Sequence, residues 1–269
     1  MMLLLWLKNF KMSKVLVIGD GCKDVFQYGK CDRLSPEAPV PVFKPTKNTA
    51  NGGMAMNVYA NLLALGVECD VITDSGITKT RYVDETSNQM LLRIDENDEV
   101  PQLMLEDLMK FNLNDYDAVV ISDYNKGFLT EEIILYLAEN HHMVFMDTKK
   151  DLHTWCNDIF CIKINQKEYD RNASALQWYY KYNLVVTAGG KGAMYSNKSR
   201  KIAPYLIPIT EDHPVRDLSG AGDTFLAALV AKYLETDDMV KAIEFANKCS
   251  SWVVTQKGVV TVDLNKIKI

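Results

Sequence analysis

The sequence predicts an α/β fold of three layers, in which helices cover both faces of a central, mostly parallel β-sheet. Four short apolar runs, each followed by Gly, Ser, Thr or Asp, occupy residues 14–18, 118–121, 143–146 and 184–186. Runs of this kind are typical of strands buried on both faces of a parallel sheet. Helical stretches lie between them, at residues 54–65 and 130–140. This alternation indicates three layers, and ligands in such sheets bind beyond the carboxyl ends of the strands.

Two further segments predict a small β-lid. Residues 25–47 are strand-like and rich in proline, and residues 80–95 alternate polar with apolar side chains. Such alternation is typical of antiparallel strands with one face in water. We therefore expect one domain over residues 13–269, with these two segments forming a lid over a ligand site. Residues 1–12 are expected to form an N-terminal extension.

Composition and charge exclude several classes of function. The 269 residues carry a net charge of −5, which gives no basic footprint for nucleic acid. The six cysteines include no CxxC pair and the four histidines no HxxxH, which favours free thiols in a reducing cytosol and no zinc site. The apolar run at residues 1–7 is too short to span a membrane. We expect a cytoplasmic protein with no membrane or nucleic-acid partner.

The strongest chemical signal is the octapeptide DLSGAGDT at residues 217–224, which leads into an amphipathic helix. Small residues at a helix start let backbone N–H groups approach an anion, and the helix dipole adds partial positive charge. We expect Gly220, Ala221 and Gly222 to stabilise a phosphoryl group in transfer. Asp223 lies in the first helical turn, where its carboxylate is placed to accept the proton of an attacking hydroxyl.

Two other nucleotide-binding classes fit the sequence poorly. A P-loop requires GxxxxGK[ST], and the GGKG at residues 189–192 has the wrong spacing. A Rossmann dinucleotide site needs a third glycine where Asp24 stands, and a carboxylate there would repel pyrophosphate. A sugar-phosphate binder with little catalytic activity stays open as an alternative to an enzyme.

The segment DLSGAGDTF resembles the DTxGAGDxF signature of the ribokinase (PfkB-type) carbohydrate kinases, and the similarity runs from about residue 15 to about residue 262. The resemblance implies a ribokinase-like fold and phosphoryl transfer from ATP to a sugar hydroxyl, with Asp223 as general base. It implies sugar contacts through Asp20, Asp24 and the GGxxxN motif, which supplies Gly52, Gly53 and Asn57. It implies nucleotide contacts through an NxxE motif, a TxGxxG motif and two further residues: Asn165, Gln166, Lys167, Glu168, Thr187, Gly189, Gly192, Asp217 and Asn247.

The same resemblance implies the cofactors. ATP would lie along the C-terminal half of the chain. Mg²⁺ would be held near Glu168, largely through water, because Mg²⁺ keeps much of its hydration shell. A monovalent cation is a further implied ligand, although Leu218 replaces the usual threonine in the loop concerned.

Within the family, three segments resemble heptose 7-phosphate kinases: residues 33–42 (RLSPEAPVPV), residues 122–127 (SDYNKG), and Asn88-Gln89 with Arg93. This resemblance implies phosphorylation of the anomeric hydroxyl of a sugar that already carries a phosphate. Arg93, Lys126 and Lys149 are then candidate partners for that phosphate. Fructose 6-phosphate, ribose and a nucleoside stay open as acceptors.

The chain departs from its relatives after residue 73. A strand–helix segment is missing there, since residues 74–79 lead almost directly into the lid, and we expect the sheet to lack an edge unit. No HxGH motif of a nucleotidyltransferase is present, so we expect the kinase domain only. A homodimer through paired lids is expected, because bare β-edges seek partners.

Overall fold

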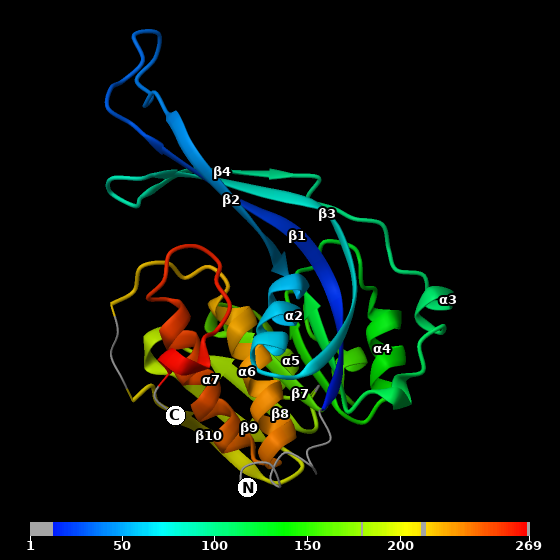
Figure 1. Ribbon diagram of the computed structural model, residues 1–269. Coiled ribbons are helices and arrows are strands. Elements are labelled where there is room, and N and C mark those ends of the chain that lie inside the picture. The colour runs from blue at the N-terminus through cyan, green and yellow to red at the C-terminus, as the bar shows by residue number, and fades with distance from the viewer. Residues whose placement is uncertain (1–12, 179, 211–213, 268–269) are drawn as a thin grey trace, which may run out of the picture.

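The computed structural model describes residues 13–178, 180–210 and 214–267 (Figure 1). A ten-stranded sheet runs in the order β10-β9-β8-β7-β6-β5-β1-β3-β4, and β2 pairs with β1. The strands are β1 (Lys14–Lys30), β2 (Lys44–Met54), β3 (Glu68–Asp84), β4 (Met90–Glu96), β5 (Ala118–Asp123), β6 (Val144–Thr148), β7 (Cys161–Asn165), β8 (Asn183–Thr187), β9 (Ala193–Asn197) and β10 (Ile202–Ile207). The α-helices are α2 (Ala55–Ala64), α3 (Leu105–Leu108), α4 (Glu131–Asn140), α5 (Gln166–Leu176), α6 (Ala221–Thr236) and α7 (Met239–Val253). The expected extension at residues 1–12 lies outside the described residues.

The centre of the sheet is parallel. The first part of β1, residues 14–19, pairs in parallel with β3 and with β5. Parallel pairing continues through β6, β7 and β8, whereas β9 and β10 are antiparallel. All of β5 and β6 is buried, as expected for strands covered on both faces. The carboxyl ends of these strands therefore meet along one edge of the sheet, close to the start of α6.

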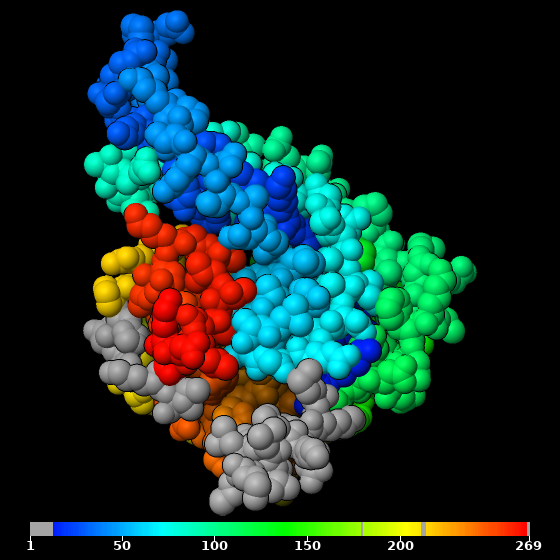
Figure 2. Space-filling view, viewed as in Figure 1, coloured from blue at the N-terminus to red at the C-terminus, as the bar shows by residue number. Residues whose placement is uncertain are grey.

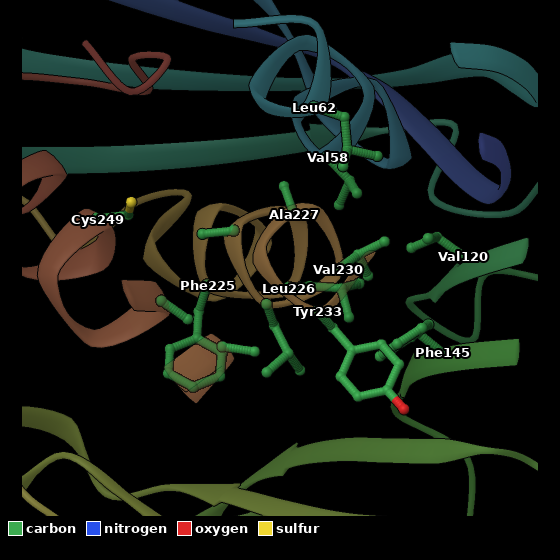
Figure 3. Packing of buried hydrophobic residues seen from close by; sticks show 14 of the residues in the cluster. Val58, Leu62, Val120, Phe145, Phe225, Leu226, Ala227, Val230, Tyr233 and Cys249 are labelled. Carbon is green, nitrogen blue, oxygen red and sulfur yellow. The ribbon is translucent and has the colours of Figure 1, made fainter. Parts of the chain in front are cut away.

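Helices cover both faces of the sheet, which confirms the predicted three-layer fold. One buried cluster joins α2, α6 and α7 to the sheet, and a second cluster joins α4 and its neighbours to the opposite face. Figure 3 shows the first cluster, in which the side chains of α6 lie between Val58 and Leu62 of α2 and Val120 and Phe145 of the sheet. Among the described residues, none of the helices has both the length and the apolar character needed to cross a membrane.

The two segments expected to form a lid contribute to two hairpins, and the lid stays a prediction. The upper half of β1 pairs with β2, and the upper half of β3 pairs with β4, both antiparallel as expected. The two hairpins join through parallel pairing of β1 with β3, because both strands continue from the parallel core. Residues 31–43, expected to be strand-like, instead form an exposed tip with one isolated bridge, Leu34 to Pro41. This tip projects away from the main body (Figures 1 and 2).

The shortened segment after residue 73 becomes a β-bulge. Asp20 pairs with Asp74 and Cys22 pairs with Ile77, so that Gly21 alone faces two residues of β3. A Cβ atom on Gly21 would lie 2.6 Å from the carbonyl oxygen of Asp74. The chain therefore passes along β3 with no intervening strand–helix unit, whose absence the sequence predicts, and glycine is needed where the strands bend.

A close strand contact at Gly19 gives a first testable expectation. A Cβ atom on Gly19 would lie 1.9 Å from the carbonyl oxygen of Ser122, so Gly19→Ala forces β1 and β5 apart. Overpacking of this kind is expected to lower the free energy of unfolding by about 3 kcal/mol. Urea denaturation measures the change, and Gly190→Ala is the control because nothing lies within 4 Å of its added Cβ. Equal stability of the two variants would contradict the β1–β5 packing described here.

Candidate active site

The anion loop, which we define as Ser219–Asp223, begins α6 at the carboxyl edge of the sheet. Gly220 has φ 78°, in the left-handed region, and a Cβ atom there would lie 2.6 Å from Nδ2 of Asn57. Among the described residues, the backbone N–H groups of Gly222 and Asp223 have no acceptor, as is usual in a first helical turn. They are therefore free to bind an anion.

Asp223 is a buried carboxylate with two donors. Its Oδ1 accepts the hydroxyl of Tyr124 at 2.6 Å, and its Oδ2 accepts Nδ2 of Asn57 at 3.0 Å. Burial raises the pKa of Asp223 to about 6, against the effect of these two hydrogen bonds. A carboxylate whose pKa lies close to neutrality suits a general base.

Asn57 is held in one orientation by its neighbours. Its Oδ1 accepts Nδ2 of Asn61 at 3.0 Å, and Oδ1 of Asn61 accepts the backbone N–H of Val262 at 3.0 Å. Because its amide donates to Asp223, Asn57 supports the base directly. Its predicted contact with the sugar stays a prediction.

The two aspartates of β1 differ in their surroundings. Asp20 is fully buried and accepts the backbone N–H groups of Tyr124, Lys126 and Phe128. Burial raises the pKa of Asp20, with Asp123 nearby acting in the same direction. Asp20 thus organises the loop after β5, and its predicted role as a sugar ligand stays a prediction.

Asp24 lies further along β1, beyond the bulge at Gly21. Its carboxylate forms an ion pair with Arg81. A Cβ atom on Gly53 would lie 2.3 Å from Oδ2 of Asp24, so the glycine leaves room for this carboxylate. Gly52 is exposed beside it, and a Cβ atom there would meet the side chain of Met56 at 2.6 Å.

A cavity of about 580 Å³ lies on the other side of the anion loop. Its lining includes Thr187, Gly189, Gly192 and Asn247, as predicted for the nucleotide, together with Gly222. Gly192 has φ 108°, and a Cβ atom there would lie 2.2 Å from the carbonyl oxygen of Ile207. The lining also contains Ser251, whose buried hydroxyl has no partner among the described residues. A glycine-rich cradle with an unsatisfied hydroxyl fits a nucleotide.

The NxxE motif begins α5. Asn165 caps the helix by accepting the backbone N–H of Glu168, and Glu168 accepts that of Asn165, a reciprocal capping box. Gln166 and Lys167 are exposed on the first turn. Asp217 lies before the anion loop and accepts the backbone N–H groups of Ser219 and Gly258. Nucleotide contacts by these residues, and the monovalent cation near Leu218, stay predictions.

A chain of buried and half-buried charges runs behind the anion loop. Nζ of Lys163 lies 2.5 Å from Oδ2 of Asp147, and Nζ of Lys149 lies 3.2 Å from Oδ1 of Asp147 and 2.6 Å from Oε1 of Glu168. Burial alone would raise the pKa of Asp147, but Lys163 and Lys149 hold it below its ordinary value. A Cβ atom on Gly222 would lie 3.2 Å from Nζ of Lys163, so this ammonium group directly backs the anion loop.

The carboxylates near the anion loop suit Mg²⁺ only through water molecules bound to the ion. Both oxygens of Glu168 already accept hydrogen bonds, one of them also pairing with Lys149. No group of three or more His, Cys, Asp or Glu among the described residues is arranged to hold a metal. This donor set is compatible with Mg²⁺ bound chiefly by phosphate oxygens and water.

The three residues predicted to bind an existing phosphate on the acceptor lie apart. Lys126 pairs with Asp98, and Lys149 pairs with Asp147 and Glu168. Only Arg93 lines a cavity beside Ser219, of about 430 Å³. The sequence interpretation assigned no role to Tyr124, Lys163, Asp147, Arg81 or Arg216, although the position of Asp147 at the end of an apolar run was a usable signal.

Comparisons with known proteins identify the family of the chain. The model of the pfkB family carbohydrate kinases matches residues 60–266. The bifunctional protein HldE of Helicobacter pylori strain J99 is 30% identical over 310 residues, which cover 96% of this chain and 66% of HldE. HldE of a Nitratiruptor species is 30% identical over 305 residues, covering 95% of this chain and 64% of that protein. The chain thus spans just under two thirds of the length of these curated relatives.

Solved structures share the fold. The nucleoside kinase of Methanocaldococcus jannaschii superposes with a TM-score of 0.67 at 18% identity, covering 96% of this chain and 95% of that chain. The ribokinase of Arabidopsis thaliana, solved with ribose and ATP, gives 0.69 at 16% identity, covering 92% and 94%. These identities support likeness of fold alone. The family match over most of the sequence establishes more: the chain belongs to the pfkB family of carbohydrate kinases and is a phosphotransferase.

Proposed function

We propose that this protein transfers the γ-phosphoryl group of ATP to the anomeric hydroxyl of a heptose 7-phosphate. Asp223 accepts the proton of the attacking hydroxyl, and the anion loop stabilises the negative charge on the phosphoryl group in transfer. Mg²⁺, bound by the triphosphate and water near Glu168, would supply further charge neutralisation. The lid excludes water, which would otherwise compete as acceptor.

The observation that carries the sugar-phosphate part of this proposal is a pair of opposed arginines. Arg81 and Arg93 are direct cross-strand partners on β3 and β4, and both line the cavity beside Ser219. Like charges directly opposite each other are unfavourable in a sheet. A phosphate between them would offset the repulsion, since guanidinium groups bind phosphate with two parallel hydrogen bonds.

Charge around this cavity supports an anionic ligand. Arg81 pairs with Asp24, and Arg93 pairs with Asp95. Arg216 lines the same cavity, is exposed, and forms no ion pair with any described residue. Arg81 also links the cavity to Asp24 on the sugar side. A phosphorylated acceptor with its hydroxyl at Asp223 and its phosphate among these arginines therefore fits better than ribose or a nucleoside.

The choice of a heptose rests on sequence resemblance. Asn88 lines the cavity beside Ser219 together with Arg93, and we call this cavity the arginine cavity. Tyr124, in the resembling segment at residues 122–127, donates a hydrogen bond to Asp223. Residues 33–42 lie at the exposed tip of the lid instead. Fructose 6-phosphate has the same phosphate chemistry and is the acceptor to compare first.

Coupled ADP-release assays over a panel of sugars and sugar phosphates test this proposal. We expect heptose 7-phosphate to give the highest kcat/KM, and unphosphorylated sugars to be poor substrates. A protein that gives no ATP turnover, but whose melting temperature rises with sugar phosphate, would contradict it and favour a binding protein.

Removing one arginine tests how much the phosphate group of the acceptor contributes to binding, apart from the rest of the acceptor. Arg93→Ala is expected to raise KM for the sugar phosphate about tenfold to a hundredfold, because a charge-assisted pair is worth about 1.5–3 kcal/mol. The KM for ATP should stay unchanged. Lys23→Ala, on the exposed outer face of β1, is the matched control. An unchanged KM in Arg93→Ala would place the phosphate elsewhere.

We also propose a cytoplasmic homodimer that pairs through the lid. Exposed apolar side chains on the lid support a contact: Leu34, Val40, Met90, Leu91, Leu92 and Ile94. Light scattering at assay concentration should give twice the mass of the chain, and a monomer would contradict the dimer.

A further inference from the structure

Tyr124 has a fixed position beside the base. It begins the loop after β5, and its hydroxyl donates to Oδ1 of Asp223 at 2.6 Å. Asp20 anchors this loop through three backbone N–H groups. Asn125 has φ 56° and Gly127 has φ 104°, so the loop turns through two left-handed positions. A Cβ atom on Gly127 would lie 3.0 Å from the carbonyl oxygen of Val100. The loop therefore has little freedom to withdraw the tyrosine.

Two ammonium groups also lie close to the ring of Tyr124. Nζ of Lys79 lies 5.7 Å and Nζ of Lys149 lies 5.4 Å from its ring centroid, within the range of cation–π attraction. Burial and the charge of Asp223 raise the pKa of Tyr124 well above its ordinary value. The hydroxyl thus stays protonated and acts as a donor at working pH.

We propose that Tyr124 is a positioning residue for the general base: its hydroxyl fixes the Asp223 carboxylate toward the anion loop and favours its ionised form. This role deepens the proposed function and rests on it. Each carboxylate oxygen has two lone pairs, so the acceptor hydroxyl binds Asp223 beside Tyr124 without displacing it. Asp20 acts through the loop, by holding Tyr124 at this distance.

Burial opposes the ionisation of Asp223. Loss of hydration favours the protonated carboxyl group of Asp223, and the hydrogen bond from Tyr124 is the largest effect that opposes it. A donor to the charged form favours that form. Without the hydroxyl, a larger fraction of Asp223 is protonated at neutral pH, and the carboxylate loses one of its two fixed partners.

The expected fall of kcat/KM below about pH 6, the acid limb of its pH profile, is not explained by the other charged groups near Asp223. Lysines hold the pKa of Asp147 below its ordinary value, and burial raises the pKa of Cys22 to about 12. Both therefore keep one protonation state between pH 5 and 9. The ionisable or polar groups facing Asp223 are Tyr124 from the loop after β5, Asn57 of α2, Asp147 of β6, Lys163 of β7 and Cys22 of β1.

The test is Tyr124→Phe, compared over pH with the wild type. We expect kcat to fall at least tenfold at pH 7, and the acid limb of kcat/KM to move upward by about one pH unit, while the KM for ATP stays unchanged. Tyr116→Phe is the matched control, because it removes a 2.8 Å hydrogen bond from a tyrosine to Asp70 far from the base. This control should leave the rate and the acid limb unchanged.

A second measurement needs no substrate and so separates this inference from the proposed function. Carbon-13 NMR of labelled aspartate, in the ligand-free protein, follows the titration of Asp223 directly. We expect Tyr124→Phe to raise that pKa above the wild-type value even if no sugar phosphate proves to be a substrate. An unchanged titration would overturn the inference, and so would a rate at or above that of the wild type, since the hydroxyl would then block the base.

Discussion

The Asp223→Asn variant is expected to lose about a thousandfold in kcat while still binding ATP. The amide cannot accept the proton of the acceptor hydroxyl, and a positioned general base contributes roughly 10²- to 10⁴-fold to the rate. Rapid-quench measurement of sugar phosphorylation at saturating ATP gives kcat, and calorimetry gives the nucleotide affinity. A variant with wild-type turnover would remove Asp223 from the mechanism.

The free energy of unfolding distinguishes loss of the general base in Asp223→Asn from loss of the folded structure. The pKa of Asp223 is about 6 in the folded protein, above its ordinary 3.8. Stability contributed by such a group falls as pH rises from the lower value to the higher one, so the ionised base costs the folded state about 3 kcal/mol at pH 8. Asp223→Asn should therefore unfold at an equal or higher urea concentration. Asp237→Asn, in the left-handed position at the other end of α6, is the control and should change neither property.

The Lys163→Met variant is expected to lose both stability and activity. Its ammonium group pairs with the buried carboxylate of Asp147 and backs the anion loop at Gly222. Breaking a buried ion pair by removing one partner costs about 3–5 kcal/mol. Loss of a positive charge near the transferred phosphoryl group should lower kcat about a hundredfold. Urea denaturation and initial rates measure the two effects.

A double variant separates the two effects. Asp147→Leu combined with Lys163→Met replaces the pair by apolar groups, which should restore most of the lost stability. Activity should stay low, because the charge behind Gly222 is still missing. Lys181→Met is the control, since it breaks an exposed pair with Asp158, and neither property should change measurably. A double variant with wild-type kcat would make the pair purely structural.

Local signals in the sequence predicted the strands and helices that carry the candidate site. The apolar runs became β1, β5, β6 and β8, and the stretch at residues 130–140 became α4, which Thr130 caps by accepting the backbone N–H of Ile133. The glycines of the anion loop adopt the helix start expected of them, with Gly220 in the left-handed region. Each of these features depends on residues that are neighbours along the chain.

Features that depend on strand register or distant pairing were not predictable in the same way. The opposition of Arg81 and Arg93 follows from the β3–β4 register, which alternation alone does not define. Lys163 stands in an apolar strand, where its burial makes sense only beside Asp147. Tyr124 meets Asp223 across a separation of 99 residues. The bulge at Gly21 likewise depends on the register between β1 and β3, which are distant in the sequence.

Phosphorus-31 NMR of the reaction of wild-type protein with ATP and heptose 7-phosphate tests most directly whether Asp223 and the arginine cavity bind opposite ends of one acceptor. The expected product is a bisphosphate, which keeps the original phosphate resonance and gains a second one coupled to the anomeric proton. Formation of ADP without a second sugar-phosphate resonance, or phosphorylation only of sugars that carry no phosphate, would contradict this arrangement.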